Sequence, residues 1–255
     1  MLTRILAHPA TRGLDLDDPE TTAIRRQIVC SKPFLKSVYD EWYQLIIGRL
    51  PAVEGDVLEL GSGGGFLDTH VEGLITSDVF EIPGVSQIID ARRLPFHDST
   101  LRAIVMANVL HHIPDVEQFF DEAQRSLRPG GRIVMIEPWN TRWSRFVHEN
   151  WHNELFDTDA ETWGFPETGP ISGANAALPW IVFRRDLARF ESEWPQLRLI
   201  ETTPFMALRY LASGGISLRS LQPGWAYPLW RGLERITGLE RRMAVFALLV
   251  VERSQ

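Results

Sequence analysis

The sequence of 255 residues contains one cysteine, Cys30, so an internal disulfide bond is impossible. That is typical of proteins from a reducing compartment, and Cys30 itself is predicted to be a small buried residue. No apolar run is longer than the nine residues 243–251, whereas a membrane-spanning helix needs about 20. The amino-terminal residues also lack the apolar core of a signal peptide, so we expect a cytoplasmic protein.

Basic stretches are missing as well. The chain has 26 lysines and arginines against 33 aspartates and glutamates, which gives a formal charge of −7. An acidic chain without a basic run is a poor match to nucleic acid, whose phosphates must be neutralised. There are no internal repeats or low-complexity segments, and we expect a single domain over residues 1–255.

Short apolar segments alternate with helical patterns in the first half of the chain. The apolar segments are nearly continuous, as in parallel strands covered on both faces, and they are 56–60, 74–78, 86–90, 102–108 and 132–138. Helices are predicted over 33–50 and 114–127. Two more strands are predicted at 197–203 and 244–252. This alternation indicates an α/β fold with a doubly wound sheet.

A glycine-rich loop, "VLELGSGGGF" at 57–66, follows the first predicted strand directly. Glycines allow a sharp turn and a close approach of the backbone to a ligand. The dinucleotide fingerprint G-x-G-x-x-G would need glycine where Phe66 stands. Acids end the first three strands: Glu59 precedes the loop, Asp78 can accept the hydroxyls of a ribose, and Asp90 can face an adenine edge. The pattern favours a nucleoside ligand other than NAD.

Five motifs together resemble those of class I S-adenosylmethionine-dependent methyltransferases, and above all the ubiquinone and menaquinone methyltransferase subgroup. They are "VLELGSGGGF", "SD", "DARRLPF", "ANVLHHIPD" and "LRPGGRIVMIEP". The resemblance covers residues 33–138 well and the last strand loosely. It implies a seven-stranded, mostly parallel Rossmann-like sheet whose last strand is antiparallel, with 33–138 as the cofactor-binding core.

The resemblance also implies a cofactor, S-adenosylmethionine, and residues that bind it. Glu59, Gly61, Ser62 and Gly63 would hold the methionine part and the ribose. Asp78 would bind the ribose hydroxyls, Asp90 and Ala91 would meet the adenine, and Asn108 would lie beside the methionine end. The segment 65–78 leaves room for only a short first helix, which would leave the cofactor more open on that side.

A separate pattern, "HENWH" at 148–152, has the His-Glu-x-x-His spacing of zinc hydrolases. Charged neighbours and the lack of an evident third ligand argue against zinc, and no metal is expected. A polar helix face is one alternative. Another is that histidines at the carboxyl rim of the sheet act as general bases, because an imidazole can take a proton near neutral pH. The base candidates are His111, His148 and His152.

The second half of the chain is predicted to serve the methyl acceptor, through additions to the sheet at 139–185 and 204–242. The latter mixes aromatic residues with arginines, as at membrane interfaces. We therefore expect methyl transfer to a small, hydrophobic or lipid-linked acceptor, with peripheral contact at the inner membrane surface. A zinc hydrolase and a non-catalytic nucleotide-binding module stay open as alternatives, as does the oligomeric state.

Overall fold

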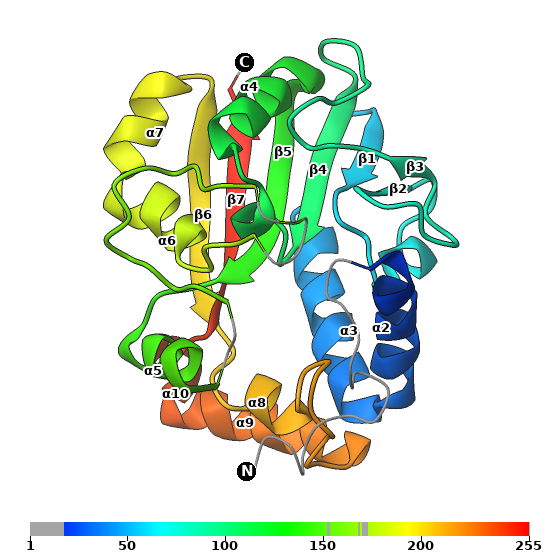
Figure 1. Cartoon of the computed structure of the whole chain (residues 1–255), viewed down its shortest axis with the longest axis vertical. Helices are drawn as coiled ribbons and strands as arrows, with labels where there is room; N and C mark the ends of the chain where they lie inside the picture. Colours follow the sequence, from blue (N-terminus) through cyan, green and yellow to red (C-terminus); the bar gives the residue numbers. More distant parts are fainter. Residues whose placement is uncertain (1–17, 152–153, 168, 170–172, 255) are drawn as a thin grey trace.

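The computed structural model describes residues 18–151, 154–167, 169 and 173–254. These residues form one seven-stranded sheet with helices on both faces (Figure 1). The strands are β1 (Asp56–Glu59), β2 (Ile75–Asp78), β3 (Gln87–Ile88), β4 (Leu101–Ala107), β5 (Leu127–Pro138), β6 (Leu197–Phe205) and β7 (Phe246–Arg253).

The strands lie in the order β3-β2-β1-β4-β5-β7-β6. β1 to β5 pair in parallel, whereas β7 is antiparallel to both β5 and β6. The predicted α/β class and mostly parallel sheet with an antiparallel last strand are therefore confirmed. Because the parallel strands all end at one edge, the segments that follow β1, β2, β4 and β5 meet there.

Two layers of helices cover the sheet. One face carries α4 (Val116–Ser126), α6 (Leu178–Trp180), the π-helical turn η4 (Ile181–Arg185) and α7 (Leu187–Glu193). The other carries α2 (Pro19–Ser31), α3 (Pro33–Ile47), α8 (Arg209–Ser213), η5 (Gly224–Ala226) and α9 (Tyr227–Thr237). The remaining elements are η2 (Leu67–Thr69), η3 (Leu110–His112), α5 (Arg142–Trp151) and α10 (Leu239–Arg242).

The central strands are apolar on both faces because both faces are buried. Along β5, Ile133 and Met135 pack into the core under α4, whereas Val134 and Ile136 pack into the core under α3. Successive side chains of a strand point to opposite faces, so a strand between two helical layers must be apolar at every position. This accounts for the nearly continuous apolar segments of the sequence.

Two local expectations need correction or refinement. Cys30 is exposed, not buried, since its neighbours Ile28 and Val29 occupy the buried face at the end of α2. The segment 139–185 is more than an addition to the sheet. Its residues 176–178 and 181–183 are fully buried in the core and close one face of the sheet.

The carboxyl-terminal helices are fastened to α3 by a buried arginine. Arg209 is 0% exposed, and its Nη2 atom lies 2.9 Å from both Glu41 Oε1 on α3 and Glu240 Oε1 on α10. Its Nη1 atom donates to Glu234 on α9. Glu234 also accepts the backbone N–H groups of residues 207–209, which links α9 to the start of α8. One cation therefore holds three carboxylates from three helices.

We expect Arg209→Ala to lower the free energy of unfolding by about 3–5 kcal/mol, because it leaves buried carboxylates without a counter-charge. Urea denaturation measures the loss. Arg235→Ala is the matched control, since Arg235 belongs to the same helical cluster and also pairs with Glu240, but its own side chain is 57% exposed. Its loss should stay below about 1 kcal/mol. Equal losses in the two variants would contradict the role given to Arg209.

Candidate active site

The glycine loop joins the ends of β1 and β2 through a chain of hydrogen bonds. The Ser62 hydroxyl donates to Glu59 Oε2 over 2.7 Å, and the backbone N–H of Ser77 donates to Ser62 Oγ over 3.1 Å. The N–H of Gly63 donates to Asp78 Oδ2 over 3.0 Å. The four residues expected around the methionine part and the ribose therefore lie in one cluster with Asp78.

Two glycines of this loop are required by their surroundings. Gly61 has a φ of +61°, and a Cβ there would lie 2.5 Å from Val109 Cγ2, in the segment that follows β4. A Cβ on Gly64 would lie 2.7 Å from the backbone nitrogen of Arg26 in α2. The loop is thus enclosed between the β4 segment and α2, with no space for side chains at either position.

Burial perturbs both acids of the cluster. Desolvation raises the pKa of Glu59 to about 7, although the hydrogen bond from Ser62 opposes the rise. Desolvation also raises the pKa of Asp78, against the opposing effect of hydrogen bonds from backbone N–H groups. A buried carboxylate is stabilised by a nearby positive charge, so the cluster is suited to a cationic ligand.

Asp90, two residues after β3, forms an ion pair with a neighbouring arginine. Both of its carboxylate oxygens accept hydrogen bonds from Arg92, at 2.8–3.1 Å, and these bonds lower the pKa of Asp90. Arg92 also pairs with Glu167. Asp90 is exposed, whereas its neighbour Ala91 is buried. Its carboxylate is therefore engaged in an ion pair at the surface.

Asn108, directly after β4, has a φ of +58°, which is uncommon for a residue other than glycine. Its backbone N–H donates to the carbonyl oxygen of Ile136 over 2.8 Å. Left-handed backbone at a non-glycine residue is often found in functional sites, where the surrounding contacts hold it in place. Here the turn redirects the chain from β4 into η3.

Glu137, near the end of β5, holds that turn and was not singled out from the sequence. It is fully buried, and its Oε1 atom accepts the N–H groups of Val109 and Leu110, both at 2.8 Å. Its Oε2 atom lies 2.6 Å from Nδ1 of His111. The only signal in the sequence was an acid inside the apolar run "RIVMIEP".

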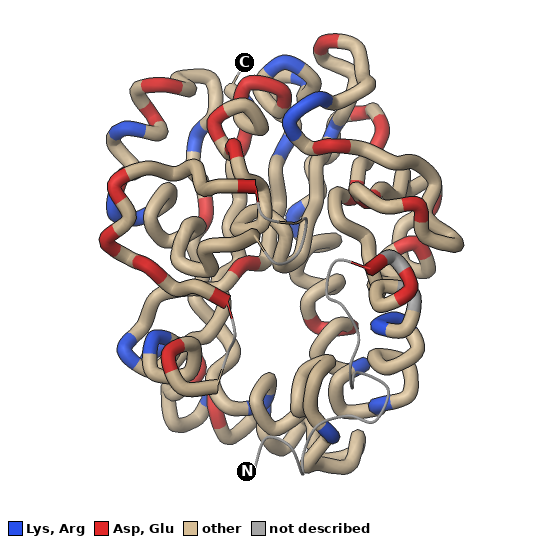
Figure 2. Tube along the Cα trace, viewed as in Figure 1, with Lys and Arg blue, Asp and Glu red and all other residues tan. Residues whose placement is uncertain are grey.

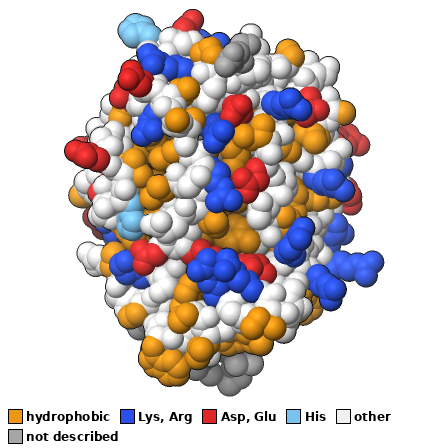
Figure 3. Space-filling model, turned by 180° about the vertical axis from the view of Figure 1, so that it is seen from behind, with side chains coloured by type: hydrophobic (Ala, Val, Ile, Leu, Met, Phe, Trp, Pro, Cys, Tyr) orange, Lys and Arg blue, Asp and Glu red, His pale blue; other side chains and the backbone are white. Residues whose placement is uncertain are grey.

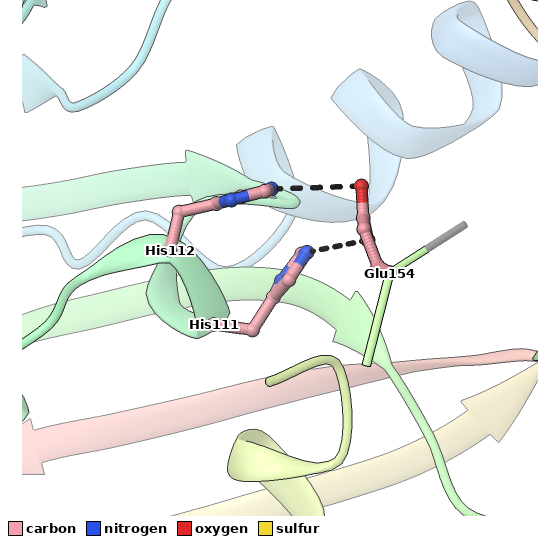
Figure 4. Close-up of side chains that lie close together, drawn as sticks. All are labelled: His111, His112 and Glu154. Atoms are coloured by element: carbon pink, nitrogen blue, oxygen red, sulfur yellow. Dashed lines mark ion pairs between the residues drawn. The ribbon is translucent and has the colours of Figure 1, made fainter. Parts of the chain in front are cut away.

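His111 and His112 both face Glu154, in the segment that follows α5 (Figure 4). Burial alone would lower the pKa of His111, but the carboxylates of Glu137 and Glu154 raise it to about 9. Burial and the charge of His111 lower the pKa of His112 to about 3. At neutral pH His111 therefore keeps its proton, and His112 is the imidazole with a free lone pair.

The "HENWH" motif lies partly outside the described residues, because His152 is not among them. His148 is buried and its ring stacks on Phe156, with 4.4 Å between centroids, whereas Glu149 is exposed. Within the described ranges, the one group of potential metal ligands is His111, His112 and Glu154, and it includes neither His148 nor Glu149. The described geometry gives no support to a zinc hydrolase at 148–152.

Comparisons with known proteins agree with this arrangement. A family model described as a methyltransferase domain matches residues 78–135. The chain is 29% identical over 136 residues to the mitochondrial 2-methoxy-6-polyprenyl-1,4-benzoquinol methylase of Xenopus laevis, over 51% of this chain and 40% of that protein. It is 26% identical over 151 residues to the ubiquinone/menaquinone biosynthesis C-methyltransferase UbiE of Bartonella tribocorum, over 56% of this chain and 53% of that protein. The matches thus span about half the length of these relatives.

Solved structures share the fold. The geranyl diphosphate C-methyltransferase of Streptomyces coelicolor A3(2), in complex with Mg²⁺, geranyl-S-thiolodiphosphate and S-adenosyl-L-homocysteine, gives a TM-score of 0.52 at 14% identity, over 97% of this chain and 86% of that one. A chain from the complex of the Haloferax volcanii Trm112 methyltransferase activator with a methyltransferase also gives 0.52, at 17% identity, over 95% and 100%. The sheet, the matched domain and the relatives together place this chain among the class I S-adenosylmethionine-dependent methyltransferases.

Proposed function

We propose that the chain transfers the methyl group of S-adenosylmethionine to a small hydrophobic acceptor, of which lipid-linked quinols are one example. The observation that carries the proposal is the cluster of Glu59, the glycine loop and Asp78. It combines hydrogen-bond acceptors for ribose hydroxyls with a buried acid suited to the positive charges of the cofactor.

Roles within the cofactor site follow from these positions. Glu59 and the loop 61–63 would hold the methionine part, and Asp78 would accept hydrogen bonds from the ribose. Ala91 offers a buried apolar contact for the adenine, whereas Asp90 would have to leave Arg92 to reach it. Asn108, at the turn after β4, would lie beside the methionine end.

The acceptor would lie beside the same strand edge, bordered by the two late segments of the chain. Glu154 comes from the segment 139–185 and Tyr210 from the segment 204–242. Burial raises the pKa of Tyr210, and the charges of Tyr39 and Glu154 raise it further. Tyr210 also stacks on Trp42, at 5.9 Å between centroids. These rings would provide an apolar wall with polar groups at defined points.

The protein needs to contribute little covalent chemistry to methyl transfer. The sulfonium is already a good leaving group, so the residues mainly align the acceptor with the methyl carbon and exclude water. A base is needed only for a hydroxyl or an acidic carbon. Of the base candidates, His111 is held by Glu137 and protonated at neutral pH, and His148 is stacked in the interior. His111 therefore has no lone pair with which to take a proton at neutral pH.

Hydrophobic acceptors are supported by the relatives, whose names refer to a polyprenyl benzoquinol and to ubiquinone or menaquinone. They are also supported by an outward apolar face on η5 and α9, where Trp225 is 73% exposed, Ile236 88% exposed, and Leu229 and Leu233 at least half exposed. From behind, groups of hydrophobic side chains gather at the end of the molecule that carries these helices (Figure 3). No helix in the described ranges is long and apolar enough to cross a membrane.

Charge around this face would favour an anionic membrane surface. Basic segments lie along the lower helices in Figure 2. The acids of the segment 204–242, Glu234 and Glu240, turn inward to Arg209, while its exposed charged residues are all arginines: Arg219, Arg235, Arg241 and Arg242. Apolar side chains beside outward cations suit peripheral contact with a membrane, from which a lipid-linked acceptor could enter.

Replacement of Asp78 by alanine tests the cofactor site. We expect Asp78→Ala to weaken the binding of S-adenosylhomocysteine by about 1–3 kcal/mol, because ribose hydroxyls lose their acceptor. Isothermal titration calorimetry measures the affinity. Asp56→Ala, at the opposite end of β1, should bind like the wild type. Binding of NAD in place of S-adenosylhomocysteine would overturn the assignment.

Cofactor binding should also depend on pH through Glu59. A cationic ligand favours the ionised carboxylate, whose pKa in the free protein is about 7, so binding below that pH must release a proton. The affinity for S-adenosylmethionine should therefore fall roughly five- to tenfold from pH 7.5 to pH 6. Glu59→Gln should flatten this part of the profile, whereas Glu54→Gln, an exposed neighbour, should keep it. An unchanged slope in Glu59→Gln would exclude the contact.

Flotation with phosphatidylglycerol-containing vesicles tests the membrane contact. Wild-type protein should float with the vesicles, less so in high salt, which screens the arginines. The double variant Trp225→Ser with Ile236→Ser should stay in the soluble fraction. Ile88→Ser, at an exposed apolar residue of β3, should float like the wild type. Wild-type protein that never floats would remove the membrane part of the proposal and leave the cofactor site untouched.

A further inference from the structure

We propose that His111, His112 and Glu154 bind one divalent transition-metal ion. One ligand atom from each residue lies within 4.8 Å of the other two. Nε2 of His111 is 3.5 Å from Glu154 Oε2, and Nε2 of His112 is 3.9 Å from Glu154 Oε1. Ligands bound to zinc at about 2.0–2.1 Å in tetrahedral geometry are about 3.3–3.5 Å apart. The three side chains thus need only a small approach to close on an ion.

The outer partners of the imidazoles orient them for this task. Nδ1 of His111 is occupied by Glu137, at 2.6 Å, and Nδ1 of His112 faces the carbonyl oxygen of Gly173, at 3.4 Å. A proton on each Nδ1 atom leaves the Nε2 lone pairs for the ion. Metal-binding histidines usually donate their other N–H to a carboxylate or a backbone carbonyl, which fixes the tautomer and the ring orientation. Both kinds of partner are present here.

Charge and burial favour a divalent ion at this point. Binding of the ion would displace the Nε2 proton of His111, and Glu137 and Glu154 would then bring two negative charges to a place where His111 and Glu137 are almost fully buried. Buried charges need a partner of opposite sign, and a divalent cation would supply both positive charges. Figure 4 shows the two rings converging on the carboxylate of Glu154 from η3.

The ligand set indicates the class of metal. Two imidazoles and one carboxylate suit Zn²⁺, Fe²⁺, Co²⁺ or Ni²⁺, whereas Mg²⁺ and Ca²⁺ prefer oxygen ligands alone. Three protein ligands leave at least one position of the ion open, as in catalytic zinc sites. His111 and His112 lie far along the sequence from "HENWH", and the acid of this group is Glu154, two residues after the motif, in place of Glu149.

The open position of the ion indicates which atom of the acceptor reacts. This part of the inference rests on the proposed function. A hydroxyl oxygen bound to the ion would lose its proton to solvent more readily. The oxygen would then attack the methyl carbon and form the O–CH₃ bond, while the electrons of the S–CH₃ bond return to sulfur and S-adenosylhomocysteine leaves. The acceptor would accordingly be a small molecule with a hydroxyl group, such as a quinol.

Co²⁺ titration of the tag-free full-length chain tests the site, because bound cobalt absorbs in the visible range. We expect one Co²⁺ per chain, displaced by one Zn²⁺. His112→Ala and Glu154→Gln should each weaken binding at least tenfold. The matched controls, His97→Ala and Glu149→Gln, replace an exposed histidine and the acid of "HENWH", and both should bind like the wild type. His111 is left unchanged because its loss would strand the buried Glu137.

Several results would overturn the inference. One is wild-type protein without stoichiometric Co²⁺ or Zn²⁺, and another is equal uptake by His112→Ala, Glu154→Gln and the controls. Loss of metal in Glu149→Gln but not in Glu154→Gln would assign the ion to 148–152 instead. Thermal melting of each variant identifies any that fail to fold. Calorimetry with S-adenosylhomocysteine on the same samples distinguishes the metal site from the proposed function. Protein that binds the cofactor but no metal would overturn only the metal site. Protein that binds metal but no cofactor would overturn the proposed function.

Discussion

The arrangement of the candidate site depends on the buried carboxylate of Glu137. A charge so far from water is costly unless hydrogen bonds and an opposite charge offset it, and here two backbone N–H groups and the imidazole of His111 do so. The same three bonds fix the segment that leaves β4. They hold Asn108 in a left-handed conformation, bring Val109 against Gly61, and direct both histidines toward Glu154. One side chain thereby couples the glycine loop to the histidine pair.

A second buried charge, on Arg209, fixes the positions of the carboxyl-terminal helices. Because it attracts Glu41, Glu234 and Glu240 inward, α8, α9 and α10 lie against α3 while their apolar and cationic residues face outward. Such networks contribute little net stability compared with an apolar core. Their value here is positional, since Tyr210 directly follows the arginine and is set against Trp42. The outward face of α9 is a consequence of the inward direction of Glu234, the acid of that helix.

The sequence predicts well what depends on local pattern. The alternation of strands with helices, the glycine loop and the acids at strand ends can each be read from a short stretch of sequence. The alternation predicted the sheet correctly. The sequence predicts poorly the contacts between residues that are far apart along the chain. Glu154 lies 43 positions from His111, and no spacing rule connects them. "HENWH" has a recognisable spacing, yet His148 stacks on Phe156 and belongs to no group of potential metal ligands in the described residues. Asp90 illustrates a different limit, because Arg92, only two residues away, pairs with its carboxylate, and a sequence pattern does not show which partner a side chain takes. Competing partners are visible only in three dimensions.

The cofactor half and the acceptor half of the proposed site are held by different kinds of interaction, and this has a consequence for specificity. The cofactor half is built from short loops whose backbone N–H groups bond to Glu137 and Asp78, so few substitutions there leave the geometry intact. The proposed acceptor half would be built from side chains on the late segments 139–185 and 204–242, which are anchored by ion pairs at a few points. Side chains between those anchors can change without moving the loops at the strand ends. A protein organised in this way can keep one methyl donor while its acceptor varies, because the residues that would distinguish acceptors are not the residues that hold the donor site together.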